Sequence, residues 1–436
     1  MGWSCKVERS AAEAVIAVLS DSGGSITRLH QLLSAVSYRD WVRSYHWLDA
    51  SGMVLYFLSR LESLQLQGVL PPKTLRRFRQ NLTDNRARTA CMMAEFVLLN
   101  QSFQWVGIQF CNLKGFTLSP NSCPDPTLRC QLDFDFLVDG SQLELCREIL
   151  TRAGYELMGS TSTVWEFKAG ASEPAHIEDH YKAKPQRSVE IHFAAYATGE
   201  PARDPKLDRL NSQEIAGHSV PILAPADQFI GQALHLFGHL CGSLTRTAWL
   251  LEYRQNVLTH YADHAFWESV RERAGDDRQT EIAIGLSTLL AFQLFGGEAP
   301  SQLNHWTLER LPEAVKLWAK DYGRRSLLAN FPGTKLYLLL RDVLSGNDVS
   351  WQKEKRNSLL PRHSAPRIVH TTSKDGLRKR VRAELYQMSF NLFRLRFHIV
   401  EGLRYGIESY RWKRRLAALR NVAAPTLADD PHLTQS

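Results

Sequence analysis

Two aspartates alternate with large apolar residues in residues 132–138, which read Leu-Asp-Phe-Asp-Phe-Leu-Val. Strict alternation predicts a half-buried strand whose successive side chains point to opposite faces. We therefore expect Asp133 and Asp135 on one face and the phenylalanines on the other. Neighbouring carboxylates repel each other, so the pair alone gives the fold no advantage. A pair of divalent cations would relieve this repulsion, and hard oxygen ligands suit Mg²⁺. The alternative is a strand end whose acids face water.

Two further strand patterns flank the aspartate pair. Upstream, residues 105–115 form an apolar run that ends in Lys114 and Gly115. Downstream, residues 188–193 read Ser-Val-Glu-Ile-His-Phe, and their alternation places Glu190 and His192 together on one face. The sequence thus predicts three strands, two of which carry acids on a single face.

The order and spacing of these motifs resemble the uncharacterised bacterial nucleotidyltransferase-like family. Its members carry Leu-Lys-Gly, a stretch ending in Arg, an Asp-x-Asp strand, a helix followed by Gly-Tyr, and a Glu-x-His strand. The corresponding pieces here are residues 113–115, Arg129, 133–138, 154–155 and 190–192. The similarity continues through residues 234–240 and 246–252. Lys-Gly stands where general nucleotidyltransferases have Gly-Gly or Gly-Ser, and Glu252 stands where this family usually has Asp.

The resemblance implies an α+β fold, in which a small mixed-sheet nucleotidyltransferase core is flanked by N-terminal and C-terminal helical regions. It also implies transfer of a nucleoside monophosphate from a nucleoside triphosphate to a hydroxyl acceptor, with release of pyrophosphate. Asp133, Asp135 and Glu190 would be the catalytic and metal-binding residues. They would hold two Mg²⁺ ions, which clamp the phosphates and lower the pKa of the attacking hydroxyl.

Four residues are expected to bind the nucleotide: Lys114, Gly115, Arg129 and His192. Lys114 would meet the triphosphate as a point charge, and Arg129 would meet it as a bidentate fork. For Lys114 the alternative is an exposed strand-end cation, and Arg129 has a similar structural alternative. For His192 the alternative is a packed residue beside Glu190.

Two other classes of function remain open. One is a catalytically silent nucleotide-binding scaffold that keeps the fold. The other is a different Mg²⁺-dependent phosphoryl- or glycosyl-transfer enzyme on the same scaffold. The sequence has no P-loop and no Gly-x-Gly-x-x-Gly motif that would favour another nucleotide fold. His235 and His239 have a zinc-compatible i, i+4 spacing, but a supporting role near the nucleotide or plain helix packing is favoured over zinc.

Length and patterning predict four regions in this chain of 436 residues. Residues 1–104 would form a helical region, 105–200 the catalytic core, 201–350 a helical domain, and 351–436 a basic, partly helical region. Residues 352–377 are polar and contain proline, which predicts a linker, and residues 429–436 are expected to be disordered.

Several features predict a cytoplasmic protein. No run of eighteen apolar residues is present, and the first nine residues lack the apolar segment of a signal peptide. The Met1-Gly2 start resembles a myristoylation signal but is followed by Lys6 rather than Ser or Thr. The seven cysteines show no C-x-x-C pair and are expected to be reduced thiols.

The net charge of +8 is concentrated toward the C-terminus. Basic runs at residues 378–382 and 411–415 flank an aromatic-rich stretch of helical period, 385–397. One reading is a packed helix with a solvated basic face, in which Phe390, Phe393, Leu395 and Phe397 cover apolar surface of the body. The other is an anionic partner: polyphosphate, a membrane surface or, less favoured, nucleic acid.

Overall fold

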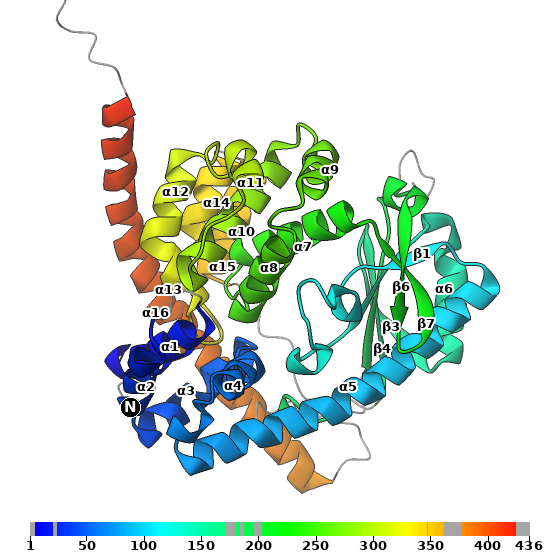
Figure 1. The fold of residues 1–436 in the computed structure, drawn as a ribbon, viewed down its shortest axis with the longest axis horizontal. Helices are drawn as coiled ribbons and strands as arrows, with labels where there is room; N and C mark the ends of the chain where they lie inside the picture. Colours follow the sequence, from blue (N-terminus) through cyan, green and yellow to red (C-terminus); the bar gives the residue numbers. More distant parts are fainter. Residues whose placement is uncertain are drawn as a thin grey trace, which may run out of the picture.

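A mixed sheet lies at one side of the molecule, with helices on both of its faces and a larger helical region beside it (Figure 1). The computed structural model describes residues 5–20, 24–170, 179–183, 187–195, 203–346, 348–361 and 376–423. The Met1-Gly2 start and the expected disordered end at 429–436 lie outside the described residues, as does most of the predicted linker.

The chain begins with helices, as its apolar periodicity predicts. They are α1 (Cys5–Leu19), α2 (Ile26–Ser34), α3 (Tyr38–Ala50), α4 (Val54–Ser63), the 3-10 turn η1 (Gln67–Val69) and α5 (Pro72–Val106). Serine side chains cap α2 and α3 by accepting hydrogen bonds from backbone amides. The long helix α5 begins with a proline at its first position and ends at Gly107, whose φ is +79°.

The sheet has seven strands in the order β3-β4-β5-β2-β1-β7-β6. The strands are β1 (Phe110–Asn112), β2 (Phe134–Val138), β3 (Tyr155–Ser160), β4 (Val164–Ala169), β5 (Arg187–His192), β6 (Leu210–Ile215) and β7 (His218–Leu223). β2 runs parallel to β5 and β1 parallel to β7, whereas the other neighbours are antiparallel. The mixed sheet and its flanking helices confirm the predicted α+β class.

One face of the sheet is closed by α5 and by α6 (Leu143–Arg152), as Figure 1 shows. Phe134 and Phe136 of β2 are buried in an apolar cluster shared with both helices. The alternation seen in the sequence therefore decides which β2 side chains enter this core. Asp135 projects from the opposite face.

The connections around the sheet contain short helical turns: η2 (Gly115–Leu118), η3 (Pro126–Leu128), η4 (Gly140–Gln142) and η6 (Pro205–Asp208). Beyond β7 the chain is helical, through α7 (Pro225–Leu240), α8 (Thr247–Thr259), α9 (His264–Ala274), α10 (Arg278–Phe295), α11 (Ser301–Trp306), α12 (Glu313–Trp318), a π-helical turn η7 (Ala319–Gly323), α13 (Arg324–Leu327), α14 (Tyr337–Ser345) and α15 (Val349–Leu359). These helices share one apolar core with α1–α4.

The strands β6 and β7 lie beyond residue 200, within the region predicted to be a helical domain. The division into four regions remains a prediction. The predicted linker at 352–377 overlaps α15, which continues to Leu359, so its first part is helical rather than a loop. Within the described parts of the chain, no helix combines the length and apolar character that crossing a membrane requires.

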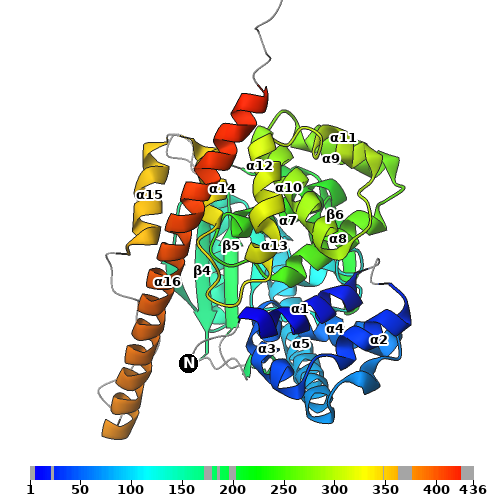
Figure 2. The same ribbon diagram turned by 90° about the vertical axis from the view of Figure 1, so that its left-hand side faces the viewer.

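The last helix, α16 (Leu377–Ala423), is 47 residues long and runs along the outside of the helical region (Figure 2). It is anchored by Tyr405 and Trp412, which are 8% and 2% exposed in the main apolar core. The expectation that Leu395 covers the body is wrong, because it is 57% exposed, whereas Phe393 is 41% exposed and its ring stacks on Phe331 with 6.2 Å between the centroids. Phe390 and Phe397 are half-buried, and Lys335 lies over the Phe397 ring, so this side of the helix faces the body as expected, whereas Leu395 lies on the outer side.

Candidate functional site

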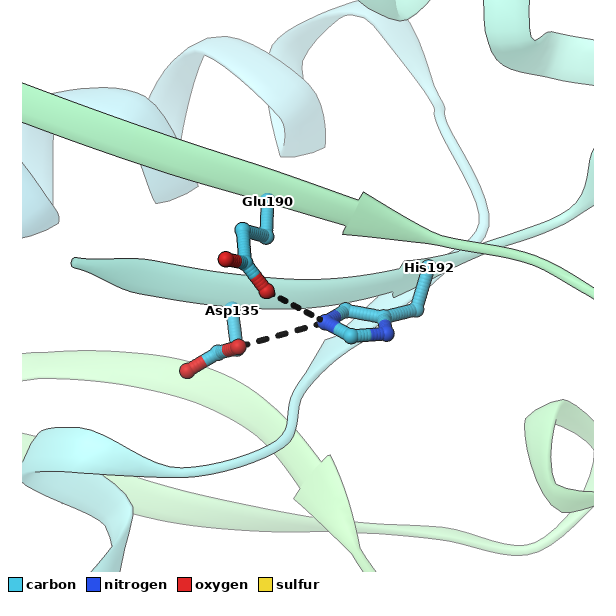
Figure 3. A group of neighbouring side chains, drawn as sticks. All are labelled: Asp135, Glu190 and His192. Carbon is cyan, nitrogen blue, oxygen red and sulfur yellow. Dashed lines mark hydrogen bonds and ion pairs between the residues drawn. The ribbon is translucent and has the colours of Figure 1, made fainter. Parts of the chain in front are cut away.

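The centre of the candidate site is a group of three side chains on the two parallel strands β2 and β5. Asp135 is paired in register with Glu190, and His192 lies two residues beyond Glu190 on the same strand. All three therefore project from the face opposite to α5 and α6. His192 Nε2 is 3.2 Å from Asp135 Oδ1 and 3.4 Å from Glu190 Oε2 (Figure 3).

This group has the spacing of a metal site. One ligand atom from each of Asp135, Glu190 and His192 lies within 4.8 Å of the other two. Two carboxylates and an imidazole are a donor set that Mg²⁺, Mn²⁺ or another first-row divalent ion accepts, the carboxylates being the ligands Mg²⁺ prefers. The residues present therefore fit a divalent cation.

Asp133 lies just before β2 begins, rather than within the strand as the alternation predicted. Asp133 is not part of the three-residue group, and the third member of that group is His192. Burial, together with the charge of Asp135, raises the pKa of Asp133 to about 6. The two aspartates are thus near enough to interact, and Asp133 borders the site.

Asp135 is the most buried acid of the site, with a side chain only 5% exposed. Lys114 Nζ donates a hydrogen bond to its Oδ1 over 2.9 Å. Burial by itself would raise the pKa of Asp135, but the hydrogen bond with His192 and the charge of Lys114 hold it below its usual value. The pKa of His192 is raised, because its bonds to Asp135 and Glu190 outweigh its burial.

Gly115 allows the chain to turn sharply after Lys114. Its φ is +73°, a region that L-residues rarely adopt, and a Cβ there would collide with the side-chain amide of Gln131. The same amide donates a hydrogen bond to the backbone oxygen of Asp133 over 2.9 Å. The Lys-Gly pair thus lets both ends of the β1–β2 connection meet beside the acids.

Arg129 is held by Glu252 from α8, with 3.2 Å between Nε and Oε2. Tyr56 of α4 donates a hydrogen bond to the other Glu252 oxygen over 2.8 Å. Burial would lower the pKa of Arg129, but the Glu252 charge raises it above its usual value. The Arg129 charge in turn acts on Asp133 and on His235. Glu252, whose role the sequence left open, anchors Arg129 beside the site.

A cluster of three rings lies across from the acids: His235 and His239 of α7 and Trp249 of α8. The His235 and His239 centroids are 4.7 Å apart, and they lie 5.0 and 4.4 Å from the Trp249 ring. Arg246 covers Trp249 at 5.5 Å from the ring centroid. Burial and the nearby Lys114 charge lower the pKa of His235 to about 3, so this imidazole is neutral.

Trp249 and Arg246 were not predicted as site residues. A Trp and an Arg near a helix start carry no chemical pattern of their own, although both lie in the 246–252 stretch of the family resemblance. Burial and the charge of Lys114 lower the pKa of both His235 and His239, and the effect of Lys114 indicates that the pair lies near the site. Among the described residues no third His, Cys, Asp or Glu joins them to make a metal-binding group, so this pair lacks support as a zinc site.

Comparison with known proteins agrees with the resemblance in the sequence. The model of a family described as "Uncharacterised nucleotidyltransferase" matches residues 37–296, and the chain belongs to this family. No curated protein matches. A solved structure, an antigenic nucleotidyltransferase-like protein from Paracoccidioides brasiliensis, is similar at 11% identity and a TM-score of 0.27, over 43% of this chain and 88% of that one.

Proposed function

Because the chain belongs to a nucleotidyltransferase family, we propose that it transfers a nucleoside monophosphate from a nucleoside triphosphate to a hydroxyl acceptor, in a metal-dependent reaction. The observation that carries the proposal is the group of Asp135, Glu190 and His192 on one sheet face. Carboxylates converging beside cationic side chains are what a triphosphate and its divalent ion require.

In this proposal the acids are the metal ligands. Asp135 and Glu190 would hold a divalent cation, Mg²⁺ in the cell, and Asp133 would supply a carboxylate to a second ion. A bound cation would neutralise charge on the phosphates and lower the pKa of the acceptor hydroxyl. Asp133 suits such a role, because with a pKa of about 6 it is already largely ionised near neutral pH. Glu190 would otherwise serve as the base that takes the hydroxyl proton.

The cationic and aromatic residues would bind the nucleotide. Lys114 would leave Asp135 for a phosphate once a metal neutralises that carboxylate. Arg129, held by Glu252 through Nε, would offer its terminal nitrogens to the triphosphate. His192 would stay with the acids as a ligand or a hydrogen-bond donor, and Gly115 would let the backbone approach the phosphates. The Trp249 ring cluster would stack against the base.

A second candidate function also has an observation in its favour. Lys114 and His192 already neutralise Asp135 by direct hydrogen bonds, so the fold tolerates this acid without a metal. That arrangement suits a catalytically silent nucleotide-binding scaffold. A kinase-like or glycosyl-transfer enzyme would use the same ligands and differ in which bond breaks.

We also propose a bacterial, cytoplasmic setting. Among the described residues, Cys111, Cys123 and Cys146 are buried thiols that form no disulfide. Burial raises the pKa of Cys111, Cys123 and Cys146 to about 12, so these thiols are unreactive packing groups. Such thiols persist in a reducing compartment, which is also where nucleoside triphosphates are available.

The test is pyrophosphate release from each nucleoside triphosphate, with Mg²⁺ and a panel of sugar, peptide and nucleic-acid hydroxyl acceptors. Asp135→Asn should abolish release, whereas Asp276→Asn, which changes an exposed aspartate away from the site, should leave it unchanged. Mg²⁺-dependent nucleotide binding without release under any acceptor would favour the scaffold. Equal turnover by wild type and Asp135→Asn would contradict the assignment.

A further inference from the structure

The outer side of α16 carries a long stripe of exposed apolar side chains. Ten of them recur at intervals of three or four residues and are between 49% and 78% exposed: Leu377, Val381, Leu385, Met388, Leu392, Leu395, Ile399, Leu403, Ile407 and Tyr410. At 1.5 Å per residue the stripe is about 50 Å long. A continuous apolar surface of this size on a protein marks an interaction site.

The stripe is held outward by the packing of the opposite side of the helix. Tyr405 and Trp412 enter the main core, and Glu408 forms ion pairs with Arg325 and Arg411. Glu401 is buried and accepts a hydrogen bond from the backbone amide of Lys335. Helical geometry puts these anchoring positions on the far side from Leu385 and the rest of the stripe. The body therefore presents the stripe to solvent.

The charge of α16 indicates the kind of partner that the apolar stripe binds. Residues 377–423 contain twelve Lys and Arg against three Glu. Two of these three acids are already paired with arginines, Glu401 with Arg404 and Glu408 with Arg411. Exposed arginines flank the stripe, among them Arg378, Arg382, Arg396 and Arg414. An apolar stripe bordered by cations is complementary to acyl chains beneath anionic head groups.

A second copy of the chain fits the stripe less well. The alternating four- and three-residue spacing of a coiled coil holds from Val381 to Ile399, but the next two positions of that seam are Gly402 and Gly406. Glycine has no side chain that could pack between the residues of a facing helix. Pairing two such helices would also bring arginine-rich flanks together, and like charges destabilise the pair.

We propose that α16 is a membrane-surface helix, which lays its apolar stripe into the interface of a bilayer rich in anionic lipids and holds the proposed enzyme there without spanning the bilayer. The proposal rests on exposure, spacing and charge, and it is independent of the reaction assigned to the sheet.

The test is co-sedimentation of the full-length protein with vesicles of phosphatidylcholine alone, and with vesicles of phosphatidylcholine mixed with phosphatidylglycerol. Wild type should bind the anionic vesicles at least about tenfold more tightly than the neutral ones, and added salt should weaken binding. The triple substitution Leu385→Glu, Leu392→Glu and Ile399→Glu should reduce binding to anionic vesicles at least about tenfold.

A matched control introduces the same three charges elsewhere. Leu98, Trp105 and Met158 are 62%, 92% and 60% exposed and lie on α5 and β3 rather than on α16, so replacing them with Glu should leave vesicle binding at the wild-type level. Thermal unfolding of both triple variants checks that they fold. Equal vesicle binding by the two variants would overturn the proposal. So would a wild-type dimer, seen by light scattering, that only the α16 substitutions dissociate.

Discussion

Replacing Asp133 by Asn should stabilise the metal-free protein near neutral pH. The ordinary pKa of Asp, 3.8, is raised to about 6 at this position by burial and by the charge of Asp135. The folded state therefore binds the proton more tightly than the unfolded state does, so ionising Asp133 costs stability as the pH rises from about 4 to about 6. A shift of about two units at 1.36 kcal/mol each gives a penalty of about 3 kcal/mol above pH 6.

Asn keeps the shape of the side chain and cannot ionise, so it removes this penalty. If the chain unfolds as one unit, its entropy of unfolding at roughly 2 cal/mol/K per residue converts about 3 kcal/mol into a rise in Tm of about 3 °C. The rise should be present at about pH 8 and absent at about pH 4, where Asp133 is protonated in both states. Adding Mg²⁺ should raise the Tm of wild type at about pH 8 and have a smaller effect on the variant.

Thermal denaturation of the two proteins across this pH range, with and without Mg²⁺, measures these differences. Asp276→Asn, at an exposed position, controls for the loss of one negative charge. A variant that is less stable than wild type at about pH 8, or whose Tm differs from that of wild type by the same amount at both pH values, would contradict this reasoning. It would show that ionised Asp133 does not destabilise the metal-free protein.

Three other substitutions probe the surroundings of the acids. Glu252→Gln should destabilise the fold by about 3 kcal/mol in urea denaturation, because it leaves the buried Arg129 guanidinium without its counter-charge, and it should weaken triphosphate binding. Trp249→Ala should raise the dissociation constant of a nucleoside triphosphate by about fivefold to 150-fold in calorimetry, the loss of one stacking contact, while divalent-ion affinity stays the same. Gly115→Ala should cost more stability than Gly217→Ala: the two glycines have φ of +73° and +76°, but only the first has a side chain where the new Cβ would lie. Equal losses for the two glycines would show that the contact with the Gln131 amide is unimportant.

The alternation of residues was enough to predict β2 and β5 and the faces of Asp135, Glu190 and His192, but not the position of Asp133. Side chains two residues apart on a strand point to the same face, so Glu190 and His192 lie together. The buried phenylalanines of β2 mark the face of that strand that packs into the core. Alternation cannot tell which strands are neighbours, and the parallel pairing of β2 with β5 is what brings Glu190 opposite Asp135. Nor could it show that the strand begins after Asp133, which leaves His192 as the third member of the group.

The helical surroundings of the site were harder to predict because they depend on long-range contacts. The ion pair of Arg129 and Glu252 joins residues 123 positions apart, and the ring cluster combines two helices that share no local pattern. In α16 the helical period was evident, but apolar residues recur on two sides of the helix. Only the burial of Tyr405 and Trp412 shows which side packs on the body.

The central claim is nucleotidyl transfer at Asp135 and Glu190, and the position of the label in the products tests it most directly. The protein would be incubated with Mg²⁺, candidate acceptors and a nucleoside triphosphate labelled at either the α- or the γ-phosphorus. Our account predicts that the α-label moves to an acceptor while the γ-label leaves in pyrophosphate, and that Asp135→Asn and Glu190→Gln abolish both. Transfer of the γ-label to an acceptor, with release of a nucleoside diphosphate, would contradict it.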